Sequence, residues 1–82
     1  NYEFAMLELV HFVILYVISP EGELLKFIHE FTEPITLWEC GDFMEFERDK
    51  WAVYNEEINR WVMNNGSGHM IAHECVQDEN RM

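Results

Sequence analysis

The feature that most limits the possible fold of this chain is a long apolar run, from Phe4 to Ile18, that is followed directly by the turn sequence Ser19-Pro20-Glu21-Gly22. Proline presets φ for the second position of a type I turn, and glycine takes the left-handed position that closes a hairpin. The returning segment, Glu23 to Phe31, alternates between two faces. One face carries Leu25, Phe27, His29 and Phe31, and the other carries Leu24, Lys26, Ile28 and Glu30. The first strand is apolar on both faces, which predicts a central strand covered by a helix on one side and by a partner molecule on the other.

Two shorter strands are expected next. Pro34 is expected to end the first hairpin, because proline cannot donate to a strand ladder. Ile35 to Glu39 and Phe43 to Glu47 then predict two strands around Cys40-Gly41-Asp42, where glycine permits a tight loop. The sheet would therefore consist of two hairpins.

An apolar stripe at helical spacing follows. A helix is expected to begin near Asp49, whose side chain can cap it, and to end at Asn64-Asn65-Gly66. Its inner face would carry the residues that recur at steps of three and four, namely Trp51, Tyr54, Ile58, Trp61 and Val62. His69 to Val76 predicts a last strand, and 77–82 a frayed polar tail. The expected fold is a single α+β domain over 1–82: a small antiparallel sheet of two hairpins plus a C-terminal strand, with one helix packed on one face, in the order ββββαβ.

The charge of the chain limits its partners. Sixteen Asp and Glu against five Lys and Arg give a net charge of −11. Such a field repels phosphate backbones, so direct nucleic-acid binding is not expected, whereas a basic protein partner is attracted. The most membrane-like segment, Leu9 to Ile18, is about half the ~20 residues that a spanning helix needs. Neither a membrane span nor a secretion signal is therefore predicted, and a cytoplasmic location is expected.

Cysteine and histidine residues offer a candidate metal site. Cys40 and Cys75 lack a cysteine-dense framework around them, so both are predicted to be free thiols in a reducing cytoplasm. If 69–76 is a strand, His69, His73 and Cys75 share one face, and Cys40 would be a fourth zinc ligand on a neighbouring strand. The set lacks the paired ligands at short spacing that structural zinc sites use. No metal or other cofactor is therefore predicted, and a His/Cys metal-binding protein is kept as an alternative.

Catalytic signals are weak in this sequence. His73 and Cys75 would lie ~6–7 Å apart along a strand, too far for direct proton transfer, and no third residue orients them. Carboxylates are abundant, but nothing places one of them in an apolar cleft, as acid–base chemistry requires. A glycine-rich phosphate loop and a nucleotide fingerprint are both missing. A non-enzymatic protein is expected.

Acidic residues concentrate between Ile35 and Asp49, among large apolar side chains. The predicted partner-binding residues are Trp38 as an apolar anchor and the acids Glu39, Asp42, Glu45, Glu47 and Asp49. On a strand, alternate acids stand ~6.5–7 Å apart, close to the spacing of every second phosphate along a DNA strand. Like charges this close repel one another, and a basic partner would relieve that repulsion. A solvated acidic face that serves solubility is an equally open interpretation.

In size, acidity, aromatic content and absence of a catalytic motif, the chain resembles phage-encoded inhibitors such as anti-CRISPR and other DNA-mimic proteins. The resemblance lies in whole-chain properties and in no motif. It implies an inhibitor that acts in the host cytoplasm by occupying a basic nucleic-acid-binding surface of a host defence complex. The alternative is a structural or antitoxin-like module that binds through its sheet, as a homodimer or by edge-strand addition.

Overall fold

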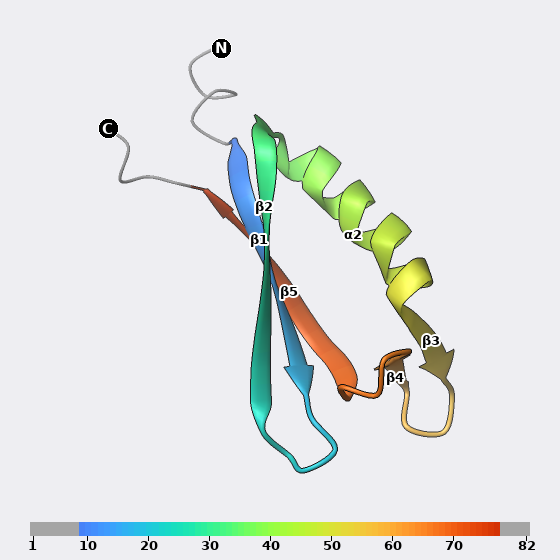
Figure 1. Ribbon diagram of the computed structural model, residues 1–82. Helices are drawn as coiled ribbons and strands as arrows, with labels where there is room; N and C mark the ends of the chain where they lie inside the picture. Colours follow the sequence, from blue (N-terminus) through green and yellow to red (C-terminus); the bar gives the residue numbers. More distant parts are fainter. Residues whose placement is uncertain (1–8, 78–82) are drawn as a thin grey trace.

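In the computed structural model, which describes residues 9–77, five strands form one antiparallel sheet and a helix covers part of one face (Figure 1). The elements in chain order are β1 (Val10–Ile18), β2 (Leu24–Ile35), α2 (Leu37–Trp51), β3 (Ala52–Asn55), β4 (Arg60–Met63) and β5 (His69–Gln77). Their order across the sheet is β2-β1-β5-β4-β3. The α+β class is confirmed, but the predicted order ββββαβ is wrong, since the helix follows the second strand. Residues 4–8 of the predicted first strand and 78–82 of the predicted tail lie outside the described residues.

The first hairpin forms at the predicted turn. The Ser19 amide donates to the carbonyl oxygen of Glu23 at 2.8 Å, and the Gly22 amide donates to that of Ser19 at 2.8 Å. Gly22 has φ +89°, in the left-handed region that glycine adopts without a steric penalty. β2 continues through Pro34 to Ile35, further than predicted. It is an edge strand, and an edge strand tolerates a proline because an amide that points to solvent is not needed for pairing with a neighbouring strand.

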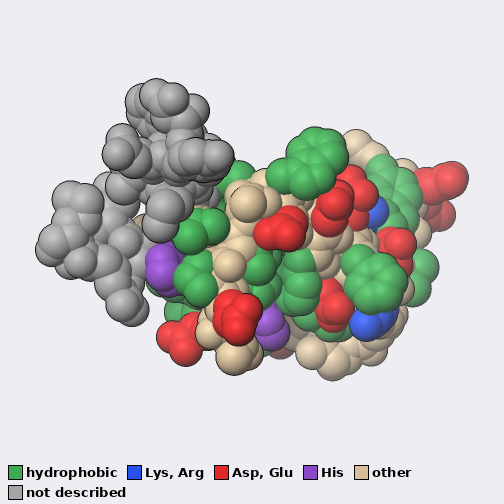
Figure 2. Space-filling model, turned by 90° about the horizontal axis from the view of Figure 1, so that it is seen from above, with side chains coloured by type: hydrophobic (Ala, Val, Ile, Leu, Met, Phe, Trp, Pro, Cys, Tyr) green, Lys and Arg blue, Asp and Glu red, His purple; other side chains and the backbone are tan. Residues whose placement is uncertain are grey.

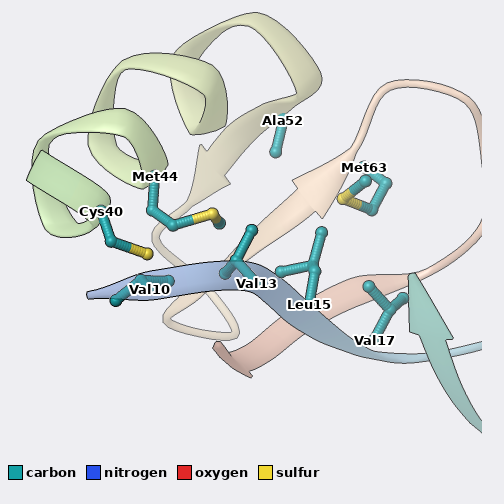
Figure 3. Packing of buried hydrophobic residues seen from close by; sticks show 8 residues of the cluster. All are labelled: Val10, Val13, Leu15, Val17, Cys40, Met44, Ala52 and Met63. Atoms are coloured by element: carbon teal, nitrogen blue, oxygen red, sulfur yellow. The ribbon is translucent and has the colours of Figure 1, made fainter. Parts of the chain in front are cut away.

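The core forms between β1 and the helix. β1 is central, between β2 and β5, and buries Val10, Val13, Leu15 and Val17. Figure 3 shows these side chains with those that complete the core, Cys40 and Met44 from α2, Ala52 from β3 and Met63 from β4. Cover by a helix on one side of β1 is therefore confirmed. On the other side, no element among residues 9–77 packs over β1, and cover by a partner there stays a prediction.

The predicted second hairpin is wrong, because 37–51 is helical. The helix begins with a capping box, in which the Glu39 amide donates to Thr36 Oγ1 at 3.1 Å and the Thr36 amide donates to Glu39 Oε1 at 2.9 Å. This pattern, Thr36-x-x-Glu39, is a local helix signal. It outweighs Gly41, which lowers helix propensity by about 1 kcal/mol relative to alanine. The helical conformation also turns Cys40 and Met44 towards the core.

The predicted helix after Asp49 is also wrong, because β3 and β4 form a hairpin there. Asn55 Oδ1 accepts from the Glu57 amide at 2.9 Å, and Asn59 takes a left-handed conformation with φ +59°, so this loop turns the chain back. Tyr54 lies opposite Trp61 with ring centroids 5.4 Å apart. The steps of three and four residues that favoured a helix also fit two short strands joined by this loop. Asn64 to Gly66 is a turn between strands and not a helix end.

Candidate functional site

The side of α2 that faces away from the sheet gathers most of the predicted binding residues. α2 turns Cys40 and Met44 inward, with Phe43 and Trp51 packed beside them. The opposite side, called here the outer face of α2, consists of the exposed residues Trp38, Glu39, Asp42, Glu45, Phe46 and Asp49. Successive residues on a helix are turned by about 100°, so residues three and four apart share a face. A helix has therefore brought together residues that were expected on a hairpin.

Glu47 is the exception among the predicted site residues. Its side chain is 19% exposed, and its Oε2 lies 3.3 Å from Lys50 Nζ. On the helix Glu47 falls between the outer face and the core, on the side of Phe43 and Cys40. The prediction that Glu47 contributes charge to the same surface as Glu45 is wrong, because strand alternation does not apply to a helix.

The remaining acids differ in whether their carboxylates form hydrogen bonds or ion pairs within the protein. Glu39 accepts hydrogen bonds within the capping box, and Asp49 Oδ1 lies 3.7 Å from Arg48 Nε. Asp42 and Glu45 form no ion pair or side-chain hydrogen bond within the part of the chain that the structure describes. The least compensated charge of the outer face therefore lies in the middle of the helix.

The spacing of these acids also differs from the expected one. With a rise of about 1.5 Å per residue, Asp42 and Glu45 stand about 4.5 Å apart along the helix axis, and Glu45 and Asp49 about 6 Å apart. The comparison with every second phosphate of a DNA strand assumed an extended backbone. That comparison no longer applies to this segment.

Two aromatic side chains flank the central acids. Trp38 is 79% exposed and Phe46 is 64% exposed, and they stand two helical turns, or about 12 Å, apart. Lys50 Nζ lies 4.4 Å from the centroid of the Phe46 ring, a cation–π contact that covers part of this ring. The sequence-based prediction included Trp38 in the site but not Phe46. The two residues are eight positions apart, which is close to two helical turns, and this spacing would have linked them if the segment had been recognised as a helix. Figure 2 shows apolar and acidic side chains interspersed on one side of the molecule.

The two cysteines form a disulfide, so the prediction of free thiols is wrong. Cys40 in the first turns of α2 is bonded to Cys75 in β5, with their Cα atoms 6.4 Å apart. The sequence conceals this pairing because the two residues are 35 positions apart and the predicted hairpin has Cys40 in its loop. Neither cysteine is therefore available as a thiolate ligand for the alternative zinc site, and Cys75 cannot act as a nucleophile with His73.

The two histidines of β5 do not share a face either. His73 lies opposite Leu15, but His69 lies opposite Ile18, because a bulge shifts the register of β5 between Tyr16 and Val17. An extra residue in one strand reverses the alternation beyond it, so His69 and His73 lie on opposite faces. Within residues 9–77, no group of three or more His, Cys, Asp and Glu side chains is placed to hold a metal ion.

An apolar hollow of about 200 Å³ lies between the first hairpin and α2. It is lined by Val13, Leu15, Phe27, Ile28, His29, Met44 and Trp51. His29, its one ionisable lining residue, stacks on Phe43 with ring centroids 4.9 Å apart. The stacking connects β2 to the helix, and the lining of the hollow is mostly apolar.

The sheet face away from α2 carries a tyrosine–carboxylate pair. The Tyr16 hydroxyl donates to Glu74 Oε1 at 2.9 Å. This hydrogen bond, followed by desolvation and the charge of Glu74, raises the pKa of Tyr16 above 10.0. Because the pKa of Tyr16 is higher in the folded than in the unfolded protein, its protonated hydroxyl stabilises the fold. This stabilisation is fully present below the pKa of the unfolded state, and it is lost as the pH rises through the pKa of the folded state.

We expect an alkaline ultraviolet titration, taken as wild type minus Tyr16→Phe, to show a midpoint above 10.0. Glu74→Ala should lower this midpoint, because it removes both the hydrogen-bond acceptor and the negative charge. Glu30→Ala, which removes an acid from the neighbouring strand on the same sheet face, is the matched control. An equal shift in both variants would contradict a specific role for Glu74.

Comparison of the chain with protein-family models, with curated proteins and with solved structures finds no match. Among residues 9–77, no helix has the length and apolar character needed to cross a membrane. Function is therefore inferred from the side chains of the site themselves.

Proposed function

We propose that the protein is a non-enzymatic inhibitor that docks the outer face of α2 on a basic, nucleic-acid-binding surface of a host protein complex. The observation that carries this proposal is that Trp38, 79% exposed, shares a helix face with Asp42 and Glu45. A helix with exposed apolar anchors binds in a groove of its partner, and aromatic anchors supply much of the affinity in such complexes. The acids complement a rim of Lys and Arg and steer the encounter.

The exposed aromatic residues favour this interpretation over a face that serves solubility alone. Acidic residues by themselves keep a small domain soluble, whereas an exposed tryptophan and phenylalanine oppose solubility. Trp38 and Phe46 instead flank the two acids that lack partners in the described residues. Large aromatic side chains are enriched in protein–protein interfaces relative to the rest of the protein surface.

A cytoplasmic site of action is part of the proposal, and the disulfide bears on it. Cytosolic thiol systems keep most cysteine pairs reduced. Action there therefore requires α2 to stay docked on the sheet when Cys40 and Cys75 are thiols. Both side chains lie at the helix–sheet contact, and Cys40 is fully buried. Binding should accordingly be measured with both the oxidised and the reduced protein.

Charge reversal on the outer face of α2 is expected to abolish partner binding. Protein immobilised through its C-terminus is used to capture proteins from a bacterial lysate, and affinity for the captured protein is then measured after its purification. Asp42→Lys with Glu45→Lys should weaken binding roughly 100-fold or more, because each buried charge pair that is disrupted costs several kcal/mol. Trp38→Ala should weaken it roughly 30-fold, as expected for an aromatic anchor.

The matched control is Glu21→Lys with Glu23→Lys, which changes net charge equally at the turn of the first hairpin. It should leave most of the affinity intact. The captured protein should be basic, should be displaced by duplex DNA and should dissociate as salt increases. A partner that binds the outer-face variant and the control equally well, or that DNA does not displace, would contradict the proposal.

A further inference from the structure

A second interaction surface lies at the opposite end of the sheet from β3. β2 is an edge strand of 12 residues, and no strand within residues 9–77 pairs with its outer edge. In Figure 1 the first hairpin projects beyond the helix, and its edge is not overlain by α2. Long unpaired edges present free amide and carbonyl groups to other chains. The surface is separate from the outer face of α2 and lies beyond the function proposed above.

The first hairpin determines which backbone groups of β2 are free. Ser19 and Glu23 form a hydrogen-bonded pair, with a Ser19 amide to Glu23 carbonyl distance of 2.8 Å. Hydrogen-bonded and non-hydrogen-bonded pairs alternate along an antiparallel ladder. Counted in steps of two from Ser19–Glu23, the next hydrogen-bonded pairs are Val17–Leu25, Leu15–Phe27 and Val13–His29. The backbone amides and carbonyls of the odd-numbered residues of β2 therefore bond to β1. The amides and carbonyls of Lys26, Ile28 and Glu30 point outward.

The side chains of Lys26, Ile28 and Glu30 are arranged symmetrically, with opposite charges on either side of Ile28. Lys26 and Glu30 stand two residues on either side of Ile28, on the sheet face that α2 does not cover. Neither Lys26 nor Glu30 forms an ion pair within the described part of the chain. Ile28 is 62% exposed between them. A strand of this pattern is complementary to a second copy of itself.

Charge selects one register for such a pair, because the outward backbone groups of β2 can form hydrogen bonds in several registers. A two-fold axis through Ile28 places each Lys26 opposite Glu30 of the second copy and pairs outward backbone groups throughout. An axis through Lys26 or Glu30 would place like charges opposite each other, which is destabilising. An axis through Phe27 or His29 would also pair outward backbone groups, but it would place Ile28 opposite Lys26 or Glu30 and leave the two charges without an opposite partner.

We propose that two copies of this chain associate through β2, antiparallel about a two-fold axis at Ile28, to form one sheet that runs through both copies. Each copy presents the same patch, as an isologous interface requires. Backbone hydrogen bonds form between Lys26, Ile28 and Glu30 of one copy and the same residues of the other. Two Lys26–Glu30 ion pairs fix the register, and the two Ile28 side chains meet at the axis. The outer face of α2 remains free in both copies.

Sedimentation equilibrium of the purified oxidised protein tests the pairing directly. We expect wild type to dimerise in about 0.15 M salt, where long-range repulsion between acidic copies is screened. Lys26→Glu and Glu30→Lys, made singly, should each weaken dimerisation at least 10-fold, because each places two like-charged pairs in the interface. The double variant Lys26→Glu with Glu30→Lys should restore dimerisation, because it exchanges the charges and keeps the complementarity. Lys50→Glu, on α2, is the control for net charge.

Ile28→Pro provides an independent test. It removes an amide that points away from β1, so the hairpin ladder keeps its hydrogen bonds while the edge loses one. We expect a folded monomer, verified by thermal unfolding and circular dichroism. A wild type that stays monomeric at high concentration would overturn the proposal, and so would a dimer that tolerates both the single charge reversals and Ile28→Pro. Neither result depends on binding by α2, so failure here is distinguishable from failure of the proposed function.

Discussion

Removal of the Cys40–Cys75 disulfide is expected to lower the free energy of unfolding by about 4 kcal/mol. The bond closes a loop across a sequence separation of 35, and loop-closure entropy of the unfolded chain gives this value for a loop of that length. A domain of this size has a total stability on the order of 5–10 kcal/mol. Loss of the bond should therefore lower the melting temperature by roughly 15–30 °C. α2 is the element affected most, because this bond is its covalent connection to β5.

The measurement is urea unfolding of the oxidised protein, of the reduced protein and of Cys40→Ala with Cys75→Ala. The reduced protein and the double variant should agree within about 1 kcal/mol, since both lack the cross-link. The intact oxidised protein should have the mass expected for loss of two hydrogen atoms. Two free thiols in protein folded under oxidising conditions, or equal stability with and without reductant, would contradict the assignment.

Gly68→Ala is expected to destabilise the protein by about 3 kcal/mol or more. Gly68 precedes β5 with φ +133°, a conformation that is strained for a residue with a side chain. A Cβ atom there would also collide with the backbone of Ile18 and Ser19 at the end of β1. Backbone strain and steric overlap each cost about 1–3 kcal/mol, and neither can relax without moving one of the two strand ends.

Gly66→Ala in the same turn is the matched control. Gly66 also has a positive φ, +81°, but a Cβ atom there would meet nothing within 4 Å. Its cost should therefore be limited to strain of about 1–2 kcal/mol. Equal destabilisation by the two substitutions, in chemical denaturation or thermal unfolding, would show that the close approach of Gly68 to β1 is not important.

Local sequence alone determined the first hairpin, because the proline and glycine of Ser19-Pro20-Glu21-Gly22 allow the chain few conformations besides a turn. It also determined which residues of β2 share a face. The helix start was encoded locally too, in Thr36-x-x-Glu39, but a binary apolar pattern hid this signal. Each of these features depends on residues within a few positions of one another.

Tertiary structure decided the rest of the candidate site. The segment 52–63 fits a helix or a hairpin by its spacing, and pairing of β4 with β5 selected the hairpin. The Cys40–Cys75 disulfide joins residues 35 positions apart, and the bulge in β5 that separates His69 from His73 arises from its register with β1. Helical geometry then turned Asp42 and Glu45 outward and Glu47 towards Lys50. Contacts distant in the sequence chose between local conformations of similar free energy, and no short window contains those contacts.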